Sequence, residues 1–138
     1  MCHEIPLLPD IYAPVCDVRD VALAHIRAMK RPEAVGKRHL IVNDINCSAF
    51  KNWALILQKE FADKNYKIPT RVAPHFFIKI YAWFDDIAKS AVPILGVRSM
   101  FSNKNMRVNL LVEPIGLEKT IVDMAYSLID RKIVDKKF

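Results

Sequence analysis

The stretch Val15–His25 reads VCDVRDVALAH, and its pattern decides the fold that we expect. Val15–Val18 reads as a short strand. Asp20 then follows as an N-cap, because an aspartate carboxylate accepts hydrogen bonds from the free amides of a first helical turn. We therefore predict a strand that runs directly into a helix from Val21 to about Met29. The helix residues expected to face a core are Val21, Ala24, Ile26 and Ala28.

Downstream of this unit the same criteria predict more helix than strand. Leu40–Val42 is the second strand candidate. Ser48 is expected to cap a helix in which apolar residues recur at helical spacing, and Pro74 to open a third helix that runs to about Ala91. The apolar residues of the helix after Ser48 are Phe50, Trp53, Ala54, Leu57 and Phe61.

The C-terminal third of the chain adds two predicted helices. A short one follows Asn103, and a longer one covers about Glu118 to Asp130. The residues on the apolar stripe of the longer helix are Ile121, Met124, Ala125 and Leu128. Two short strands rarely form an independently stable sheet, so we expect edge strands that belong beside others.

Composition excludes several classes of protein. The chain has 138 residues, which suits a single domain, and its three glycines, Gly36, Gly96 and Gly116, lie far apart. Phosphate-binding loops need clustered glycines, so neither a dinucleotide fingerprint nor a P-loop is present. Three widely spaced cysteines offer neither a disulfide framework nor zinc-ligand spacing, and no secretory signal is apparent. We expect a reduced, cytoplasmic protein without a bound metal or a membrane partner.

The net charge of +6 is dispersed along the chain rather than gathered in one basic segment. Nucleic-acid-binding proteins usually concentrate charge on one face and interleave aromatic residues for stacking. We therefore expect no nucleic-acid partner, although an anionic small ligand would not be repelled.

The order of several segments resembles the extended short-chain dehydrogenase/reductase family. The closest branch is that of the NAD(P)-dependent epimerase/dehydratase-like reductases, which includes dihydroflavonol, cinnamoyl-CoA and aldehyde reductases. The resemblance covers nearly the whole chain, and it matches the C-terminal part of the family, roughly its last two-fifths. The matching segments are Asp17–Ala22 with Ala24-His25, Pro32–Arg38, Ser48–Phe61, Tyr66–Pro69, and Asn103–Arg107 followed by Leu110 and Pro114.

The resemblance implies a helix-rich α/β fold in which residues 1–138 form a single partial domain, with a few short edge strands and without the Gly-rich Rossmann half. The family's catalytic pair is a tyrosine with a lysine four residues later. Here Cys16, Thr70, Asp85 and Asp130 stand four residues after the four tyrosines, so the pair is absent. We therefore expect no catalytic or cofactor-binding residue in this chain and no hydride transfer by it alone. NADP or NAD is implied only for the full-length family.

The resemblance also places residues on the substrate side of such a reductase. The Pro-rich entry, with Pro6, Leu7 and Pro9, looks like the loop beside the substrate. Phe77 and Tyr81 are candidates for an apolar wall, although an aromatic stripe at helical spacing more often belongs to a core. A small carbonyl compound is the implied substrate in the full-length context.

The residues of the matching segments also have plainer explanations. Asp17, Arg19, Asp20, His25 and Asn103 are interpreted as a structural motif rather than as catalytic groups. In this interpretation His25 is a packed, hydrogen-bonded histidine, and Cys16 is an unreactive small hydrophobe in a strand. Asp85-Asp86 is interpreted as a solvated helix face.

Two positions depart from the family pattern in a way that affects the backbone. Leu111 and Lys132 stand where glycines are usual in the family. A lost turn glycine either changes the turn or forces another residue to positive φ.

Two functions therefore remain open. The first is the C-terminal substrate-binding portion of an NAD(P)H-dependent ketone or aldehyde reductase. The second is a non-catalytic interaction or dimerisation module derived from that family. The second would associate as a homo-oligomer, or dock on a full-length relative, through its unpaired strand edges.

Overall fold

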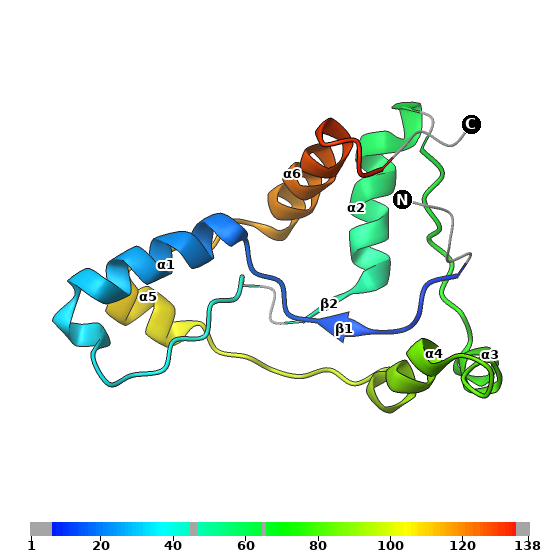
Figure 1. Cartoon of the computed structure of the whole chain (residues 1–138), viewed down its shortest axis with the longest axis horizontal. Coiled ribbons are helices and arrows are strands. Elements are labelled where there is room, and N and C mark those ends of the chain that lie inside the picture. The colour runs from blue at the N-terminus through cyan, green and yellow to red at the C-terminus, as the bar shows by residue number, and fades with distance from the viewer. Residues whose placement is uncertain (1–6, 45–46, 65, 135–138) are drawn as a thin grey trace. The chain divides into compact units, whose positions relative to one another are not determined.

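The structure, a computed structural model, describes residues 7–44, 47–64 and 66–134. It is a small helix-rich domain with a two-stranded sheet (Figure 1). Its elements are β1 (Tyr12–Ala13), α1 (Val18–Lys30), β2 (Ser48–Ala49), α2 (Phe50–Phe61), α3 (His75–Tyr81), α4 (Asp86–Ala91), α5 (Lys104–Leu110) and α6 (Leu117–Asp130), with 3-10 turns at Pro32–Ala34, Ala62–Lys64 and Val92–Ile94.

The chain divides into two compact units, which are described separately. The first unit comprises Met1–Ala13, Ser48–Arg98 and Ile121–Phe138, and the second comprises Pro14–Cys47 and Ser99–Thr120.

In the second unit, α1 begins three residues earlier than the sequence predicts. Asp17 is the N-cap, and its Oδ1 accepts a hydrogen bond from the Arg19 amide at 2.9 Å. The prediction that Asp20 caps the helix is therefore wrong. Asp20 lies buried in the first turn, where its carboxylate accepts from the Ile115 amide at 2.8 Å. Both aspartates suit the positive end of a helix dipole, so composition alone could not choose between them.

The core of this unit lies between α1 and α5. Ala24 on α1 is buried, as predicted, and Val21 is half-buried. Ile26 and Ala28 are exposed, so the prediction that they face a core is wrong. The buried cluster consists of Ala24, Ala34, Met106, Leu110 and Val112, with Ile41 packed against it.

Two arginines of the α1 segment hold the C-terminal end of α5. The Arg27 guanidinium donates to the carbonyls of Leu110, at 3.2 Å, and of Leu111. Arg31 Nε donates to the Asn109 carbonyl at 2.6 Å. The last carbonyls of a helix have no partner within it, so these cations satisfy them and complement the negative end of the dipole.

Leu111 ends α5 in the left-handed conformation, with φ of 54°. Lys132, just after α6, also has positive φ, at 56°. Of the two expected outcomes of a lost turn glycine, a changed turn or a positive φ, the structure shows the positive φ at both positions. A side chain in this region crowds the following carbonyl, at a cost of about 1–2 kcal/mol.

Leu111→Gly is expected to raise the free energy of unfolding by about 1 kcal/mol, because glycine adopts this φ without a steric cost. Leu111 is already 53% exposed, so little apolar burial is lost. Urea unfolding followed by circular dichroism measures the change. Val108→Gly is the matched control on the same helix, and it should lower the free energy by about 1 kcal/mol. A similar loss in both variants would contradict the prediction.

In the first unit, β1 and β2 pair antiparallel, with Tyr12 opposite Ala49 and Ala13 opposite Ser48.

The predicted strands over Val15–Val18 and Leu40–Val42 are wrong, because neither segment forms a ladder. The two segments, which belong to the second unit, still meet at one point, where the Asn43 amide donates to the Val15 carbonyl at 2.9 Å. One such bond is too few to make a strand.

Helix α2 supplies the core of this unit. Phe61 is fully buried, with its ring 5.6 Å from that of Tyr66 and 5.0 Å from that of Tyr126 between centroids. The prediction that Ser48 caps α2 is wrong. Ala49 stands at the N-cap and makes no side-chain cap bond, while Ser48 lies in β2.

The predicted helix from Pro74 to Ala91 is two helices, α3 and α4, separated by a turn that includes Phe84. Asp85 explains the restart, because its Oδ1 accepts a hydrogen bond from the Ala88 amide at 2.9 Å, as an N-cap does. The predicted α5 and α6 are confirmed.

Candidate functional site

The entry loop, residues 7–12, is fixed beside the segment that leads into α3. The Leu8 amide donates to the Arg71 carbonyl at 2.9 Å, and the Ala73 amide donates to the Leu8 carbonyl at 2.8 Å. Of the predicted substrate-side residues in this region, Leu7 is 39% exposed and Pro9 is half-buried. Pro6 lies outside the described residues. The loop is therefore held in place by its backbone while some of its side chains remain accessible.

Four polar side chains gather around this loop, and we call them the entry-loop cluster: Asp10, Tyr12, His75 and Arg98. Asp10 Oδ2 lies 3.0 Å from His75 Nε2, at the start of α3. Arg98 Nη2 donates to the Tyr12 hydroxyl at 2.7 Å, and its guanidinium carbon lies 4.4 Å from the Tyr12 ring centroid. The cluster thus combines an imidazole oriented by a carboxylate with a guanidinium stacked on a phenol.

Gly96 lets the backbone approach this cluster closely. Its amide donates to the Asp10 carbonyl at 2.7 Å, and its φ is 71°. A Cβ at this position would lie 3.3 Å from His75 Cε1, which is a tight contact. Glycine is therefore favoured here both by the backbone angle and by the neighbouring imidazole.

Phe77 and Tyr81, the other predicted substrate-side residues, lie on α3, whose first residue is His75. Their side chains are 62% and 60% exposed. The interpretation of the aromatic stripe as core is therefore wrong. Their predicted contact with substrate stays a prediction, and any wall they form is open to solvent.

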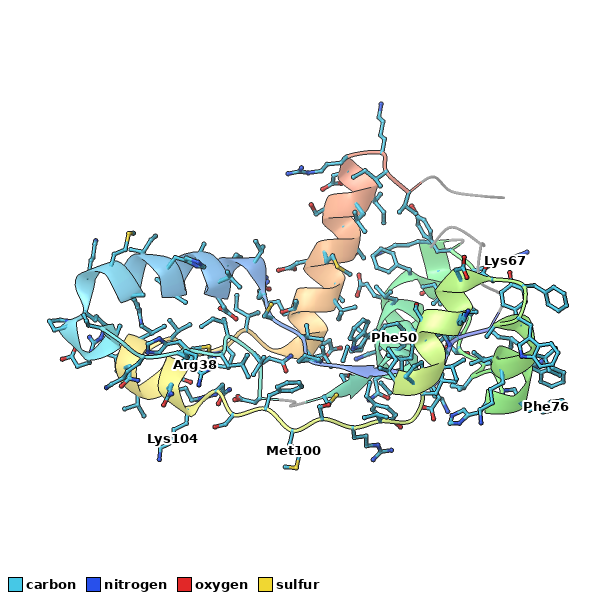
Figure 2. All side chains as sticks on the ribbon, turned by 60° about the horizontal axis from the view of Figure 1, so that its bottom comes forward. Arg38, Phe50, Lys67, Phe76, Met100 and Lys104 are labelled. Atoms are coloured by element: carbon cyan, nitrogen blue, oxygen red, sulfur yellow. The ribbon has the colours of Figure 1, made fainter. Side chains whose placement is uncertain are left out.

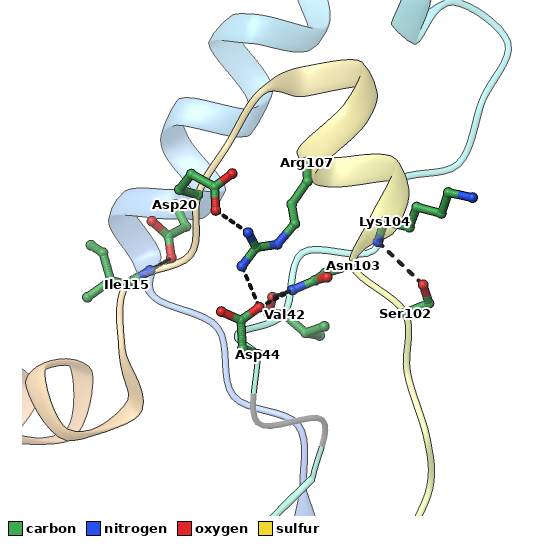
Figure 3. Close-up of polar contacts among 9 residues, drawn as sticks. Asp20, Val42, Asp44, Ser102, Asn103, Lys104, Arg107 and Ile115 are labelled. Atoms are coloured by element: carbon green, nitrogen blue, oxygen red, sulfur yellow. Dashed lines mark hydrogen bonds and ion pairs between the residues drawn. The ribbon is translucent and has the colours of Figure 1, made fainter.

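A second polar group lies in the second unit, and we call it the Asp44 network. Asn103 Nδ2 donates to Asp44 Oδ1 at 3.0 Å and to the Val42 carbonyl at 3.2 Å, while Arg107 pairs with both Asp44 and Glu113 (Figure 3). The Asn103 amide, and after it the Arg107 guanidinium, hold the pKa of Asp44 below its usual value. Asp44 is therefore ionised at neutral pH.

An open hollow of about 400 Å³ adjoins this network. Its volume lies at the low end of the range for small-molecule sites, and it offers a carboxylate, an amide and a hydroxyl beside two apolar side chains. The lining residues are Asp44, Met100, Phe101, Ser102 and Asn103.

Asp17, which the sequence analysis places in a structural motif, has hydrogen-bond donors at both carboxylate oxygens. Arg19 donates from Nε and Nη2 to the two oxygens of Asp17, at 2.8 Å and 2.7 Å, and the Thr120 hydroxyl donates to Oδ2 at 2.9 Å. Arg19 above all, with Thr120, holds the pKa of the Asp17 carboxyl well below its usual range, against the effect of burial. Both oxygens are engaged, so this carboxylate braces the helix start rather than serving as a base.

Two neighbours of this motif differ from expectation. His25 Nδ1 lies 2.8 Å from the Val21 carbonyl oxygen, so the residue is hydrogen-bonded as predicted, but it is exposed rather than packed. Cys16 is exposed and belongs to no strand, so the prediction of a small hydrophobe in a strand is wrong.

A tyrosine and a lysine do meet in the first unit, although no Tyr-x-x-x-Lys spacing exists. The Tyr126 hydroxyl accepts from Lys64 Nζ and donates to Glu60 Oε1. These bonds lower the pKa of Glu60 and raise that of Lys64, in each case mainly through Tyr126. Because the Tyr126 hydroxyl already accepts one hydrogen bond and donates another, we interpret these three side chains as a structural contact between α6 and the end of α2.

Local spacing could not have found these groups. Asp10 and His75 are 65 positions apart, Tyr12 and Arg98 are 86, and Asp44 and Arg107 are 63. The one local signal was Gly96, an isolated glycine whose distance from the other two had served only to exclude a phosphate-binding loop.

Among the described residues, no group of three or more histidine, cysteine, aspartate or glutamate side chains is placed to hold a metal ion. Over the same part of the chain, no helix combines the length and apolar character needed to cross a bilayer.

Comparison with known proteins identifies the fold. No protein-family model and no curated protein matches the chain. Among solved structures, it is similar to a reductase engineered to attenuate substrate inhibition in asymmetric catalysis, with a TM-score of 0.60 and 22% identity over 88% of this chain and 31% of that one. It is also similar to Gre2 from Candida albicans, solved in complex with NADPH, with a TM-score of 0.60 and 23% identity over 90% of this chain and 33% of that one.

The fold therefore resembles a portion of these two reductases. The chain spans about a third of the length of the reductases that it matches.

Proposed function

We propose that this chain is the substrate-side portion of an NAD(P)H-dependent carbonyl reductase. The observation that carries the proposal is the fold match, which uses 88–90% of this chain but only 31–33% of each reductase. Nearly all of this chain thus has a counterpart in a reductase, while most of the reductase has none in this chain.

The sequence supports the same division of labour. Gly36, Gly96 and Gly116 lie far apart in the sequence, so this chain does not supply a Gly-rich phosphate-binding loop. No tyrosine is followed by lysine at the fourth position. In the proposed assembly, nucleotide binding and proton donation come from the remaining two thirds of the fold, and this chain supplies loop and helix surfaces beside a ketone or aldehyde.

The entry-loop cluster is the part of this chain proposed to face that substrate. The Asp10–His75 pair and the Tyr12–Arg98 stack fix the entry loop against the start of α3 and the segment after Gly96. A loop held at both ends can present Leu7 and Pro9 at a defined distance from a bound carbonyl compound, which is the role of a positioning element.

A chimera tests the proposal directly. The third of Candida albicans Gre2 that matches this chain is replaced by the whole chain, and NADPH oxidation is followed at 340 nm with a panel of ketones and aldehydes. We expect turnover by the chimera with a substrate preference that differs from that of Gre2. The isolated chain should neither oxidise NADPH nor bind it stoichiometrically.

Two controls make the result interpretable. Gre2 that lacks the matching third should be inactive, and a chimera carrying His75→Phe should fold but show a raised KM, because the entry loop loses its anchor. A folded chimera that binds NADPH but reduces no carbonyl compound would refute the proposal. Tight binding of NADPH by the isolated chain would refute its non-catalytic part.

The second candidate, a non-catalytic interaction module, is favoured by a different observation. Several large apolar side chains lie exposed, most densely along α3 and the turn after it. The interaction module predicts that the isolated chain unfolds cooperatively, associates and binds no hydrophobic dye. A molten chain favours a fragment of a larger enzyme.

A further inference from the structure

Two side chains of the entry-loop cluster, Tyr12 and Arg98, carry hydrogen-bond donors that no described residue accepts. Arg98 Nη2 donates to the Tyr12 hydroxyl at 2.7 Å, which uses one of the five N–H groups of the guanidinium. The Tyr12 oxygen is the acceptor in that bond, and its own proton has no acceptor in the part of the chain that the structure describes. Unused donors of two residues therefore lie within one hydrogen bond of each other.

These donors are held in place rather than free to reorient in solvent. The guanidinium carbon of Arg98 lies 4.4 Å from the Tyr12 ring centroid, so the charged group stacks on the ring. The ring belongs to β1, which pairs with β2, and the Phe50 amide at the start of α2 donates to the Ile11 carbonyl at 3.0 Å (Figure 2). The backbone thus fixes the ring, and the ring fixes the guanidinium, which lowers the cost of ordering on binding.

The charge of Arg98 is not balanced by a neighbouring acid. Three other arginines each pair with a carboxylate: Arg19, Arg31 and Arg107. Among the described residues, no carboxylate pairs with Arg98, and Asp10 of the same loop is turned to His75, with its Oδ2 3.0 Å from Nε2. Arg98 is also exposed, so an anion from solution can reach it.

A carboxylate is the chemical group that this arrangement fits. Its two oxygens accept parallel hydrogen bonds in one plane, from two guanidinium nitrogens or from one of them and a hydroxyl. An uncharged ester or ketone gains no charge-assisted bond from the same donors. A phosphate monoester carries up to two negative charges, and here one cation faces it.

The donors belong to the loop that is proposed to lie beside the substrate. Gly96, whose amide donates to the Asp10 carbonyl at 2.7 Å, precedes Arg98 by two residues. Two residues span at most about 7 Å, so the guanidinium starts from the backbone that the loop holds. Leu7 and Pro9, the predicted substrate-side residues, precede Tyr12 on the same loop.

We propose that Tyr12 and Arg98 bind a carboxylate of the substrate, so that the carbonyl compounds which the full enzyme reduces are keto acids and aldehyde acids. The carbonyl part of this inference rests on the proposed function. The carboxylate part depends only on residues of this chain, and it is tested separately.

The Gre2 chimera described above tests the substrate class. Keto acids from pyruvate to levulinate are compared with their methyl esters, and we expect a higher kcat/KM for the acids. Arg98→Gln should lower kcat/KM for the acids about 10- to 100-fold, mainly through KM, and leave the values for the esters unchanged. Arg98→Lys should restore part of the preference, because it keeps the charge but loses the planar fork. Arg131→Gln removes an exposed arginine of the same unit and should keep the preference.

Three outcomes would overturn the inference while the proposed function stands. The first is a chimera that reduces esters and simple ketones without preferring acids. The second is an Arg98→Gln variant that loses activity on acids and esters equally, which would assign Arg98 a structural role. The third is a preference for acetonylphosphonate over levulinate that Arg98→Gln abolishes, which would assign the site to a phosphate group.

A titration of the full chain tests the carboxylate site without cofactor or turnover. In nuclear magnetic resonance spectra of the labelled chain, millimolar propionate should shift the Nε–H signal of Arg98, and propionamide should not. The Nε–H signals of the three paired arginines serve as internal controls and should stay in place. Absence of a shift at Arg98, or equal shifts at all four arginines, would overturn the site. A chimera that reduces no carbonyl compound refutes the proposed function instead, and the titration then decides the carboxylate site alone.

Discussion

Phe61→Ala is expected to lower the free energy of unfolding by about 3–5 kcal/mol, the largest effect of any single substitution considered for this chain. Phe61 has no exposed surface, and its ring contacts those of Tyr66 and Tyr126 from two other segments. Truncation removes the apolar transfer energy and leaves a cavity that these rings cannot close. Urea unfolding followed by circular dichroism at 222 nm measures the loss.

Leu55→Ala is the matched control for this prediction. Leu55 lies on the same helix, α2, and is 44% exposed, so its truncation should cost about 1 kcal/mol or less. Equal costs for the two variants would mean that α2 does not pack through Phe61.

Asp17→Asn is expected to lower the free energy of unfolding at pH 7 by about 2 kcal/mol. Asparagine still caps a helix, but it cannot accept the paired donors of Arg19, and its amide faces the Thr120 hydroxyl with a donor in place of an acceptor. The effect stays moderate because the Arg19 side chain is 47% exposed, which screens the charge interaction.

The same carboxylate predicts a pH dependence with a definite sign. The pKa of Asp17 in the folded chain lies well below its ordinary value, whereas in the unfolded chain aspartate titrates near ~3.9. Its contribution to stability is therefore complete above that unfolded value and declines as pH falls through the folded pKa.

Unfolding curves of the unaltered chain and of Asp17→Asn should accordingly differ most at neutral pH, and the difference should narrow progressively as the pH falls below about 4. Asp130→Asn, at an exposed position of α6, is the control and should alter stability by less than about 0.5 kcal/mol. A gap between Asp17→Asn and the unaltered chain that does not narrow on acidification would contradict the assignment of Asp17 as an ionised cap.

Helices were predictable from this sequence because their signals are local. The apolar spacing around Phe61, the cap at Asn103 and the stripe containing Ile121 and Ala125 all lie within single elements. The start of α1 was misplaced because Asp17 and Asp20 satisfy the same local rule. The contact that separates them, from Asp20 to the Ile115 amide, joins residues 95 positions apart.

The sequence contained an indication of the break between α3 and α4 that the prediction of one long helix did not use. Asp85 stands three residues before Ala88, the spacing of a side-chain cap to a backbone amide, and it was interpreted only as part of a solvated helix face. The strands failed for a different reason. A strand is defined by the segment that it pairs with. The sequence around Tyr12 and the sequence around Ala49 carry no local pattern that indicates their pairing.

The candidate sites were less predictable than the fold. The resemblance predicts that the entry loop and α3 lie beside a substrate, and this stays a prediction. No sequence pattern indicated Asp10, His75 or Arg98, because polar pairs between distant segments leave no periodic trace. Exposure was also misjudged for α3, since helical spacing of aromatic residues shows which side they share and not what covers that side.

Gly96 links residues that would otherwise drift independently in evolution. A side chain there would press on His75 while the backbone holds Asp10, so three positions scattered through the sequence share one spatial constraint. In a lineage that retains the entry loop, exchange of the histidine for a smaller residue removes the crowding, and only the strain of the positive φ then opposes a side chain at position 96. The order of substitutions is thereby biased: a change of Gly96 costs less after the imidazole has been lost than before.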